Sequence, residues 1–110
     1  MKTKSNGSRK KLPLVWEKKV ARLEEVVVNE FGYSHKNEIW KSPRTTVSCW
    51  ARWIVWHYMI KWGMTAVMAG RYSGYNHGTV SYGVKNLKKD LAQVFELRQM
   101  FTNVANEINE

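Results

Sequence analysis

The chain has 110 residues, 44% of them hydrophobic and 13% aromatic, so it can bury one core and is too short for two comfortable domains. Its formal net charge is +9, and most of the excess lies in the middle of the chain. Residues 36–89 carry nine basic groups against Glu38 alone, whereas residues 12–35 sum to −1 and residues 90–110 to −3. A basic stretch of this kind favours a polyanion such as nucleic acid as partner, because each neutralised phosphate releases counterions.

The composition also excludes several classes of protein. Cys49 is the only cysteine, which excludes an internal disulfide and a two-cysteine metal site and indicates a reducing compartment. The longest apolar run, over residues 54–60, is interrupted by His57 and is far shorter than the roughly 18 residues that a membrane span requires. The apolar run over residues 12–16 is too short for a secretion signal. We therefore expect a cytoplasmic protein that has no membrane partner.

Residues 1–11 contain no apolar side chain after Met1 and are rich in Ser, Gly and Lys, so they are predicted to form a disordered basic arm. A tether to phosphates and a solubilising end are both compatible with this composition. Residues 12–110 are predicted to form one domain.

The first predicted helix covers residues 13–31, where the apolar side chains recur at helical spacing up to Gly32. The three consecutive valines at residues 26–28 would also suit a strand, but no turn and partner strand flank them. Residues 33–43 are predicted to form a linker. It contains one short turn of helix over residues 37–40.

The longest predicted helix covers residues 47–62 and is apolar on more than one face. Trp50 and Trp62 fall on its apolar stripe, which predicts that they belong to the core. Trp53 and Trp56 lie off that stripe, and three interpretations remain for them. They could pack in the core, stack on single-stranded bases, or form a small dimer or partner surface.

Residues 65–89 have the pattern of a helix-turn-helix motif. A short helix over residues 65–72 is followed by turn residues Ser73 and Gly74, and Asn76 can cap a second helix that begins there. Gly83 inside the second helix indicates that another element packs closely against it. The final amphipathic helix extends to Ile108. The apolar face of the second helix comprises Val80, Val84, Leu87 and Leu91.

No catalytic constellation can be assembled from the sequence. The glycines of residues 70–78 are not followed by Gly-Lys-Ser/Thr or preceded by a strand, which excludes a phosphate-binding P-loop. No nucleophile, base and orienting group occur in a recognisable arrangement, so we expect neither enzymatic activity nor a cofactor. The three histidines are His35, His57 and His77, and their spacing in the sequence does not suggest a metal site.

Five short pieces of the chain match a known motif in order. The known motif consists of an Ile-Gly dipeptide, a Phe-Gly-Gly-like turn and the stretch Asp-His-Thr-Thr-Val. The corresponding residues of this chain are Met68-Ala69, Tyr72-Ser73-Gly74 and Asn76-His77-Gly78-Thr79-Val80. Upstream, Ser-Lys-Arg and Ala-Arg-Gln-Ile correspond to Ser42-Pro43-Arg44 and Ala51-Arg52-Trp53-Ile54. On these residues, the stretch from 27 to 91 resembles the C-terminal DNA-binding domain of DnaA, the bacterial chromosomal replication initiator.

The resemblance implies an all-α, Trp-repressor-like fold of about five to six helices, in which the helix from Asn76 enters the major groove of double-stranded DNA. His77 and Thr79 would meet base edges or thymine methyl groups, Asn76 would bond a base or cap the helix, and Arg44 would enter the adjacent minor groove. The DNA-binding residues implied are Arg44, Thr65, Ala66, Asn76, His77, Gly78, Thr79, Ser81 and Lys85. The residues expected to position phosphates are Arg52, Lys61, Arg71 and Lys88.

The chain departs from the family pattern at two positions of the motif. Gly78 replaces the first Thr and Tyr75 replaces a usual Arg, and one lost contact is worth about 1–3 kcal/mol of discrimination. We therefore expect an altered or less strict DNA site, in a monomer that lacks the ATPase domain of the initiator. Replication initiation or its regulation is the function implied, with other replication proteins as further partners. A transcriptional regulator and a protein-interaction module using Trp53 and Trp56 are the alternatives.

Overall fold

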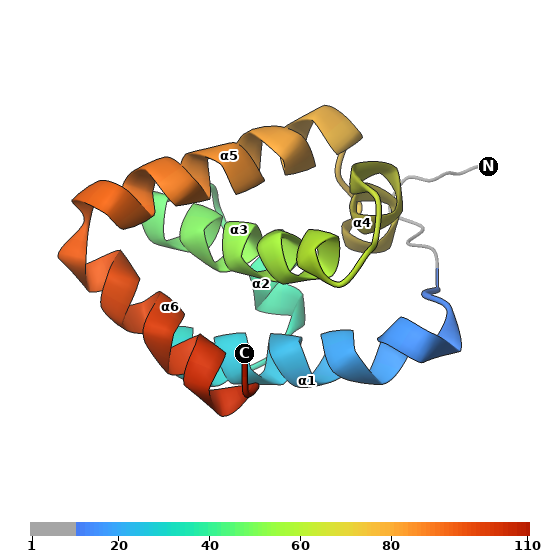
Figure 1. Cartoon of the computed structure of the whole chain (residues 1–110), viewed down its shortest axis with the longest axis horizontal. Helices are drawn as coiled ribbons and strands as arrows, with labels where there is room; N and C mark the ends of the chain where they lie inside the picture. The colour runs from blue at the N-terminus through green and yellow to red at the C-terminus, as the bar shows by residue number, and fades with distance from the viewer. Residues whose placement is uncertain (1–10) are drawn as a thin grey trace.

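The computed structural model describes residues 11–110, so the basic arm expected over residues 1–11 lies, apart from Lys11, outside the described residues. The described part of the chain is all-α and contains no strand, which confirms the predicted fold class. None of its helices is long and apolar enough to cross a membrane. The six helices (Figure 1) are α1 (Leu14–Phe31), α2 (Asn37–Lys41), α3 (Thr46–Lys61), α4 (Ala66–Ser73), α5 (His77–Gln93) and α6 (Phe95–Glu107).

The helix ends follow local signals in the sequence. α1 ends at Gly32, whose φ of 72° is a left-handed conformation that glycine adopts without cost. The valines at residues 26–28 lie inside α1 and are buried, so the helical interpretation of this segment is confirmed. α3 begins with a capping box, in which the side chains of Thr45 and Ser48 each bond the other residue's backbone N–H. These signals explain why the predicted bounds of α1 to α4 and the start of α5 agree with the observed ones within one residue, whereas the junction of α5 and α6 lies about four residues later than predicted.

The core is built around α3, which packs against α1, α2, α4 and α5. Figure 1 shows α3 running between α5 and α1, while α6 leads back from the end of α5 to α1. Because α3 has neighbours on several sides, its buried residues surround the helix instead of forming one stripe. Fully buried side chains from three helices meet here, including Leu23, Val27, Ile54, Met59 and Leu87.

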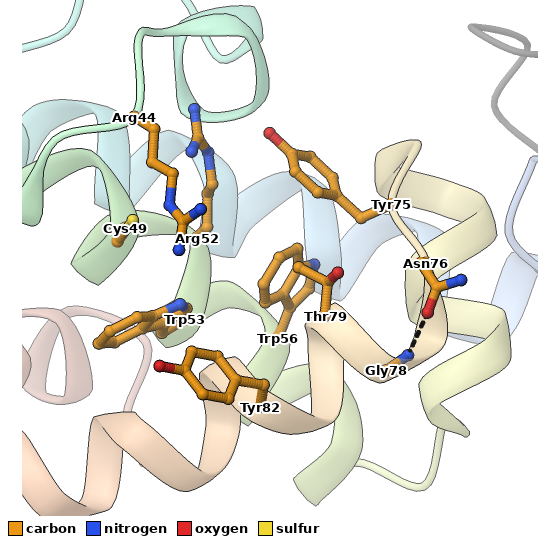
Figure 2. A pocket seen from close by; sticks show the side chains of 10 residues that line it. All are labelled: Arg44, Cys49, Arg52, Trp53, Trp56, Tyr75, Asn76, Gly78, Thr79 and Tyr82. Atoms are coloured by element: carbon orange, nitrogen blue, oxygen red, sulfur yellow. Dashed lines mark hydrogen bonds between the residues drawn. The ribbon is translucent and has the colours of Figure 1, made fainter.

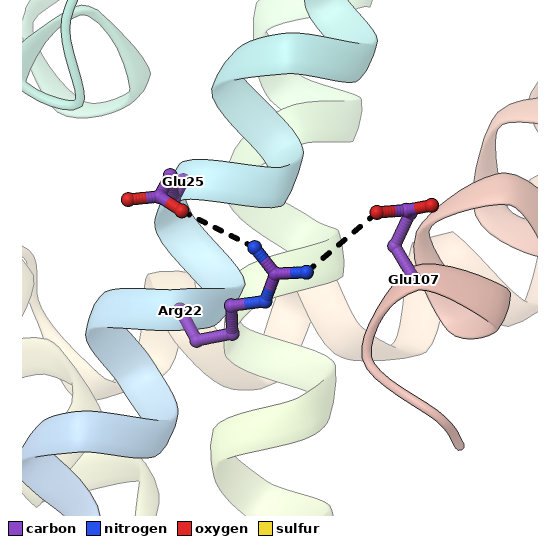
Figure 3. Close-up of polar contacts among 3 residues, drawn as sticks. All are labelled: Arg22, Glu25 and Glu107. Atoms are coloured by element: carbon purple, nitrogen blue, oxygen red, sulfur yellow. Dashed lines mark hydrogen bonds and ion pairs between the residues drawn. The ribbon is translucent and has the colours of Figure 1, made fainter.

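α6 packs against α1, and a few polar contacts lie at the edge of this packing. Arg22 of α1 lies 3.2 Å from Glu25 in the same helix and 3.6 Å from Glu107 of α6 (Figure 3). The amide of Asn103 donates to Glu30 at 3.0 Å. Since the charged side chains are more than half exposed, each pair contributes little to stability, and the apolar contacts of Leu97 and Val104 hold α6 in place.

Candidate nucleic-acid interface

The connection between α4 and α5 is a tight turn that depends on two glycines. Gly74 has a φ of 83°, and the N–H groups of Gly74 and Tyr75 both donate to the carbonyl of Gly70, at 2.8 and 2.9 Å. A Cβ atom on Gly70 would overlap the Tyr75 carbonyl oxygen and approach the backbone nitrogen of His77 to 3.4 Å. Glycine is therefore required at residue 70, because the chain returns across it. The predicted order of helix, three-residue turn and helix is observed.

Side chains cap both helices of this unit. Asn76 accepts a hydrogen bond from the N–H of Gly78 at 2.7 Å, so of its two predicted roles the structure shows the cap. Thr65, also expected to contact DNA, accepts from the N–H of Met68 at 3.1 Å and caps α4. Ala66 is the half-buried first residue of α4. The caps fix where each helix begins, and Asn76 and Thr65 remain exposed beside them.

A buried cluster ties the turn to the rest of the domain. We call it the aromatic cluster, and it comprises Glu24, Trp40, Trp56, Tyr72 and Tyr75. The indole N–H of Trp40 and the hydroxyl of Tyr72 donate to the two carboxylate oxygens of Glu24, at 2.9 and 2.7 Å. The hydroxyl of Tyr75 donates to the backbone carbonyl of Trp40 at 2.7 Å, and its ring packs edge-on to Trp56 at 5.3 Å. The cluster joins α1, α2, α3, α4 and the turn, so it fixes the direction in which α5 leaves.

The exposed positions of α5 carry five of the predicted DNA-binding residues. Val80, Gly83 and Leu87 face inward and are buried. The structure leaves exposed on this helix the residues His77, Gly78, Thr79, Ser81 and Lys85.

Tyr82 is likewise exposed on α5 and was missed by sequence reasoning. It is 58% exposed and sits one turn after Gly78 and one turn before Lys85. Its spacing of four residues from Gly78, together with its place opposite the inward positions Val80 and Leu87, is the signal that could have found it. Tyr82 therefore belongs to the candidate interface.

A groove of 570 Å³ lies between α5 and the loop that precedes α3 (Figure 2). In Figure 2 the side chain of Arg44 extends over the groove from the loop, and Thr79 and Tyr82 border it from α5. Among the residues that the structure describes, Arg44 has no carboxylate within ion-pair distance. The groove is lined by Arg44, Cys49, Arg52, Trp53, Trp56, Tyr75, Asn76, Gly78, Thr79 and Tyr82.

Arg52 does not occupy the exposed position that a phosphate contact requires. Only 6% of the residue is exposed, its Nε donates to the carbonyl of Ile39 at 2.8 Å, and its Nη2 donates to the carbonyl of Ser42. The ring of Tyr75 lies 5.6 Å from its guanidinium carbon. Those two backbone carbonyls belong to the end of α2, so Arg52 ties the end of α2 to α3 beside the loop that carries Arg44. Its predicted role of positioning phosphates does not fit this placement.

The other predicted cations divide into one that is paired and three that are not. Lys61 lies 3.2 Å from Glu110, and its hydrogen bond lowers the pKa of that carboxyl below its usual value. Lys61 is thus engaged with the C-terminal residue, away from the groove. The remaining exposed cations, which have no carboxylate partner among residues 11–110, are Arg71, Lys85 and Lys88.

Trp53 and Trp56, for which a partner surface was one interpretation, lie largely in the interior. Trp56 is 1% exposed and donates to the hydroxyl of Ser73 at 3.1 Å. Trp53 is half-buried, and a Cβ atom on Gly83 would overlap its ring, which confirms the close packing predicted at that glycine. α5 therefore covers Trp56 and part of Trp53, and only Trp53 keeps an exposed part, which lines the groove.

No group of three or more His, Cys, Asp or Glu side chains within residues 11–110 is placed to hold a metal ion. The histidines occupy separate environments, with His77 exposed at the start of α5 and His57 half-buried on α3. Comparison of the chain with models of known protein families and with curated proteins gives no match.

Proposed function

We propose that this protein binds double-stranded DNA in a sequence-specific manner, as a helix-turn-helix module similar to the C-terminal domain of DnaA. One observation carries the proposal. The outward face of α5 presents His77, Thr79 and Ser81 together with Lys85, and Arg44 lies across the adjoining groove. Short polar side chains on an exposed helix, flanked by cations without carboxylate partners, are the chemistry that base edges and phosphates require.

The proposed contacts separate into base recognition and positioning. His77 and Thr79, in the first turn of α5, meet base edges or thymine methyl groups in the major groove. Arg44 enters the neighbouring minor groove. The phosphates of the backbone are bound by Arg71, Lys85 and Lys88, which set the register without sequence information. Arg52 and Lys61 are left out of this set, because the first is buried and the second is paired with Glu110.

The resemblance to the initiator favours a role in the initiation of DNA replication or in its regulation. Occupation of a promoter by the same face would make the protein a transcriptional regulator, and the contacts with DNA would be of the same kind. In either role the protein acts as a monomer without catalysis, and other replication proteins are further partners.

The proposal is tested by fluorescence-anisotropy titration of the purified protein against the initiator family's box and a scrambled duplex, at two salt concentrations. We expect the box to bind at least about tenfold tighter, a difference of about 1.4 kcal/mol, at both salts. Equal binding of the two duplexes would mean that the protein does not recognise this box. An unbiased selection from random duplexes would then be needed to find the sequence that it prefers. Failure to enrich any sequence there would contradict the proposal.

Two substitutions on α5 test whether base contacts and phosphate contacts are made by different residues. His77→Ala should lower the affinity for the specific site with little change in the salt dependence, because it removes a base contact. Lys85→Ala should weaken all sequences alike and flatten the slope of log K against log salt by about one unit, because it removes one phosphate contact. Equal losses for both variants on random DNA would show that α5 does not divide its contacts in this way.

A further inference from the structure

We infer that the groove beside α5 holds one sugar–phosphate strand of the bound duplex, and that Tyr82 is a positioning residue that contacts this strand. The inference rests on the proposed function. It adds a site and a residue to that function, since neither the groove nor Tyr82 is needed for α5 to meet base edges.

The shape of the groove carries the first step. Its two walls come from different elements, with Arg44 on the loop before α3 and Thr79 and Tyr82 on α5 (Figure 2). A single sugar–phosphate strand separates the major groove of a duplex from each neighbouring minor groove. If α5 occupies the major groove and Arg44 reaches the minor groove, the strand between them must lie in the space that these two walls enclose.

The chemistry of the lining carries the second step. The guanidinium of Arg44 has no carboxylate partner among the described residues, and the hydroxyl of Tyr82 has no hydrogen-bond partner there either. Both groups can donate to phosphate oxygens. Trp53 lines the floor of the groove, and its half-buried ring offers an apolar surface to deoxyribose. A DNA strand alternates anionic phosphates with less polar deoxyriboses, and the groove offers both hydrogen-bond donors and an apolar surface to them.

A continuous strand fits the site better than a small anion does. The groove opens onto the exposed face of α5, because Gly78 and Thr79 belong both to its lining and to that face. Gly78 has no side chain to close this end, and a Cβ atom there would meet only the Asn76 side chain. The ligand can therefore pass along α5 instead of ending inside the groove.

The test uses the tightest duplex from an unbiased selection and three full-length proteins. Tyr82→Phe removes only the exposed hydroxyl, and Tyr33→Phe is the matched control, since Tyr33 follows α1 and does not line the groove. We expect Tyr82→Phe to weaken the selected and scrambled duplexes alike, by about tenfold, as for loss of a hydrogen bond to a charged group. Tyr33→Phe should bind as the wild type does.

Single methylphosphonate linkages then locate the strand. Neutralising one particular linkage should weaken binding by the wild type about tenfold and binding by Tyr82→Phe much less, because the same contact is already lost. Absence of such coupling at every linkage, with Tyr82→Phe equal to Tyr33→Phe, overturns the inference while sequence-specific binding persists. A free nucleoside monophosphate that displaces the duplex in a manner dependent on Tyr82 also overturns it. Failure of the wild type to bind any selected duplex instead contradicts the proposed function itself.

Discussion

Gly83 of α5 packs tightly against Trp53 of α3. A Cβ atom there would lie 2.8 Å from Nε1 of Trp53 and would also overlap its ring carbon. We expect Gly83→Ala to lower the free energy of unfolding by about 1–3 kcal/mol, the usual effect of overpacking. This outcome opposes helix propensity, by which alanine gains about 1 kcal/mol over glycine in a helix interior. Urea unfolding of the two proteins measures the difference.

Gly78→Ala is the control for this substitution in the same helix. Its Cβ atom would meet only Oδ1 of Asn76, the exposed cap of α5, at 3.0 Å, and the gain in helix propensity offsets any weakening of that cap. The variant should be as stable as the wild type or slightly more stable. If Gly83→Ala behaved like Gly78→Ala, the packing of Trp53 against α5 would not limit the residue at position 83.

Single residues were also the scale at which the sequence was least informative. The formal charge of Arg52 suggests a surface cation, yet folding places its guanidinium against the carbonyls of Ile39 and Ser42 at the end of α2. The core position of Trp56 depends on the crossing of α5 over α3, which no periodicity within α3 reveals. Tyr82 is different, because its place on the outward face of α5 follows from spacing alone.

α5 is the element whose start bears most directly on the proposed site. Asn76 accepts a hydrogen bond from the N–H of Gly78 at 2.7 Å, and asparagine is among the best N-cap residues. We expect Asn76→Ala to lower the free energy of unfolding by about 1 kcal/mol, whereas Asn76→Asp keeps an acceptor at the cap and should match the wild type. Thermal unfolding followed by circular dichroism compares the three proteins. An equally stable alanine variant would show that the cap does not contribute to folding.

Elements were the scale at which the sequence was most informative. Their boundaries are set by nearby residues, such as Gly32 after α1, the Thr45 and Ser48 capping box of α3, and Gly74 in the turn. Apolar spacing then decides which face of each helix is buried. The bounds of α1 to α4 and the start of α5 therefore follow from local signals, whereas the break at Val94 has no side-chain cap that would mark it and the packing partners depend on contacts between residues far apart in sequence.

The stability of the whole domain should depend on pH through His57, which lies where α3, α5 and α6 meet. Burial lowers its pKa below the ordinary value of 6.5, and the charges of Lys61 and Lys88 lower it further. Its ring packs edge-on to Phe101 of α6 at 5.4 Å. Below pH 6.5 the unfolded chain binds a proton at this histidine that the folded chain resists. Stability from this residue is thus fully present above pH 6.5 and is lost as the pH falls below it.

The prediction is checked by urea unfolding between pH 5 and pH 7. The wild type should lose stability across this interval, and His57→Gln should show a shallower dependence, because the glutamine does not titrate. His35→Gln is the control, since that residue is exposed in the connection between α1 and α2. Parallel pH profiles for the wild type and His57→Gln would contradict the assignment of the dependence to this histidine.

The hydrogen bond from Tyr75 to the carbonyl of Trp40 makes the unit of α4, the turn and α5 depend on residues far away in sequence. Its two partners are 35 positions apart, and the rings of Trp40, Trp56 and Tyr75 pack around them. The turn that aims α5 is thus held by residues that precede α4. Residues 65–93 would not keep their geometry if they were transplanted into another protein as a cassette. The smallest portable unit begins with α1 and includes Glu24, whose carboxylate anchors Trp40 and Tyr72.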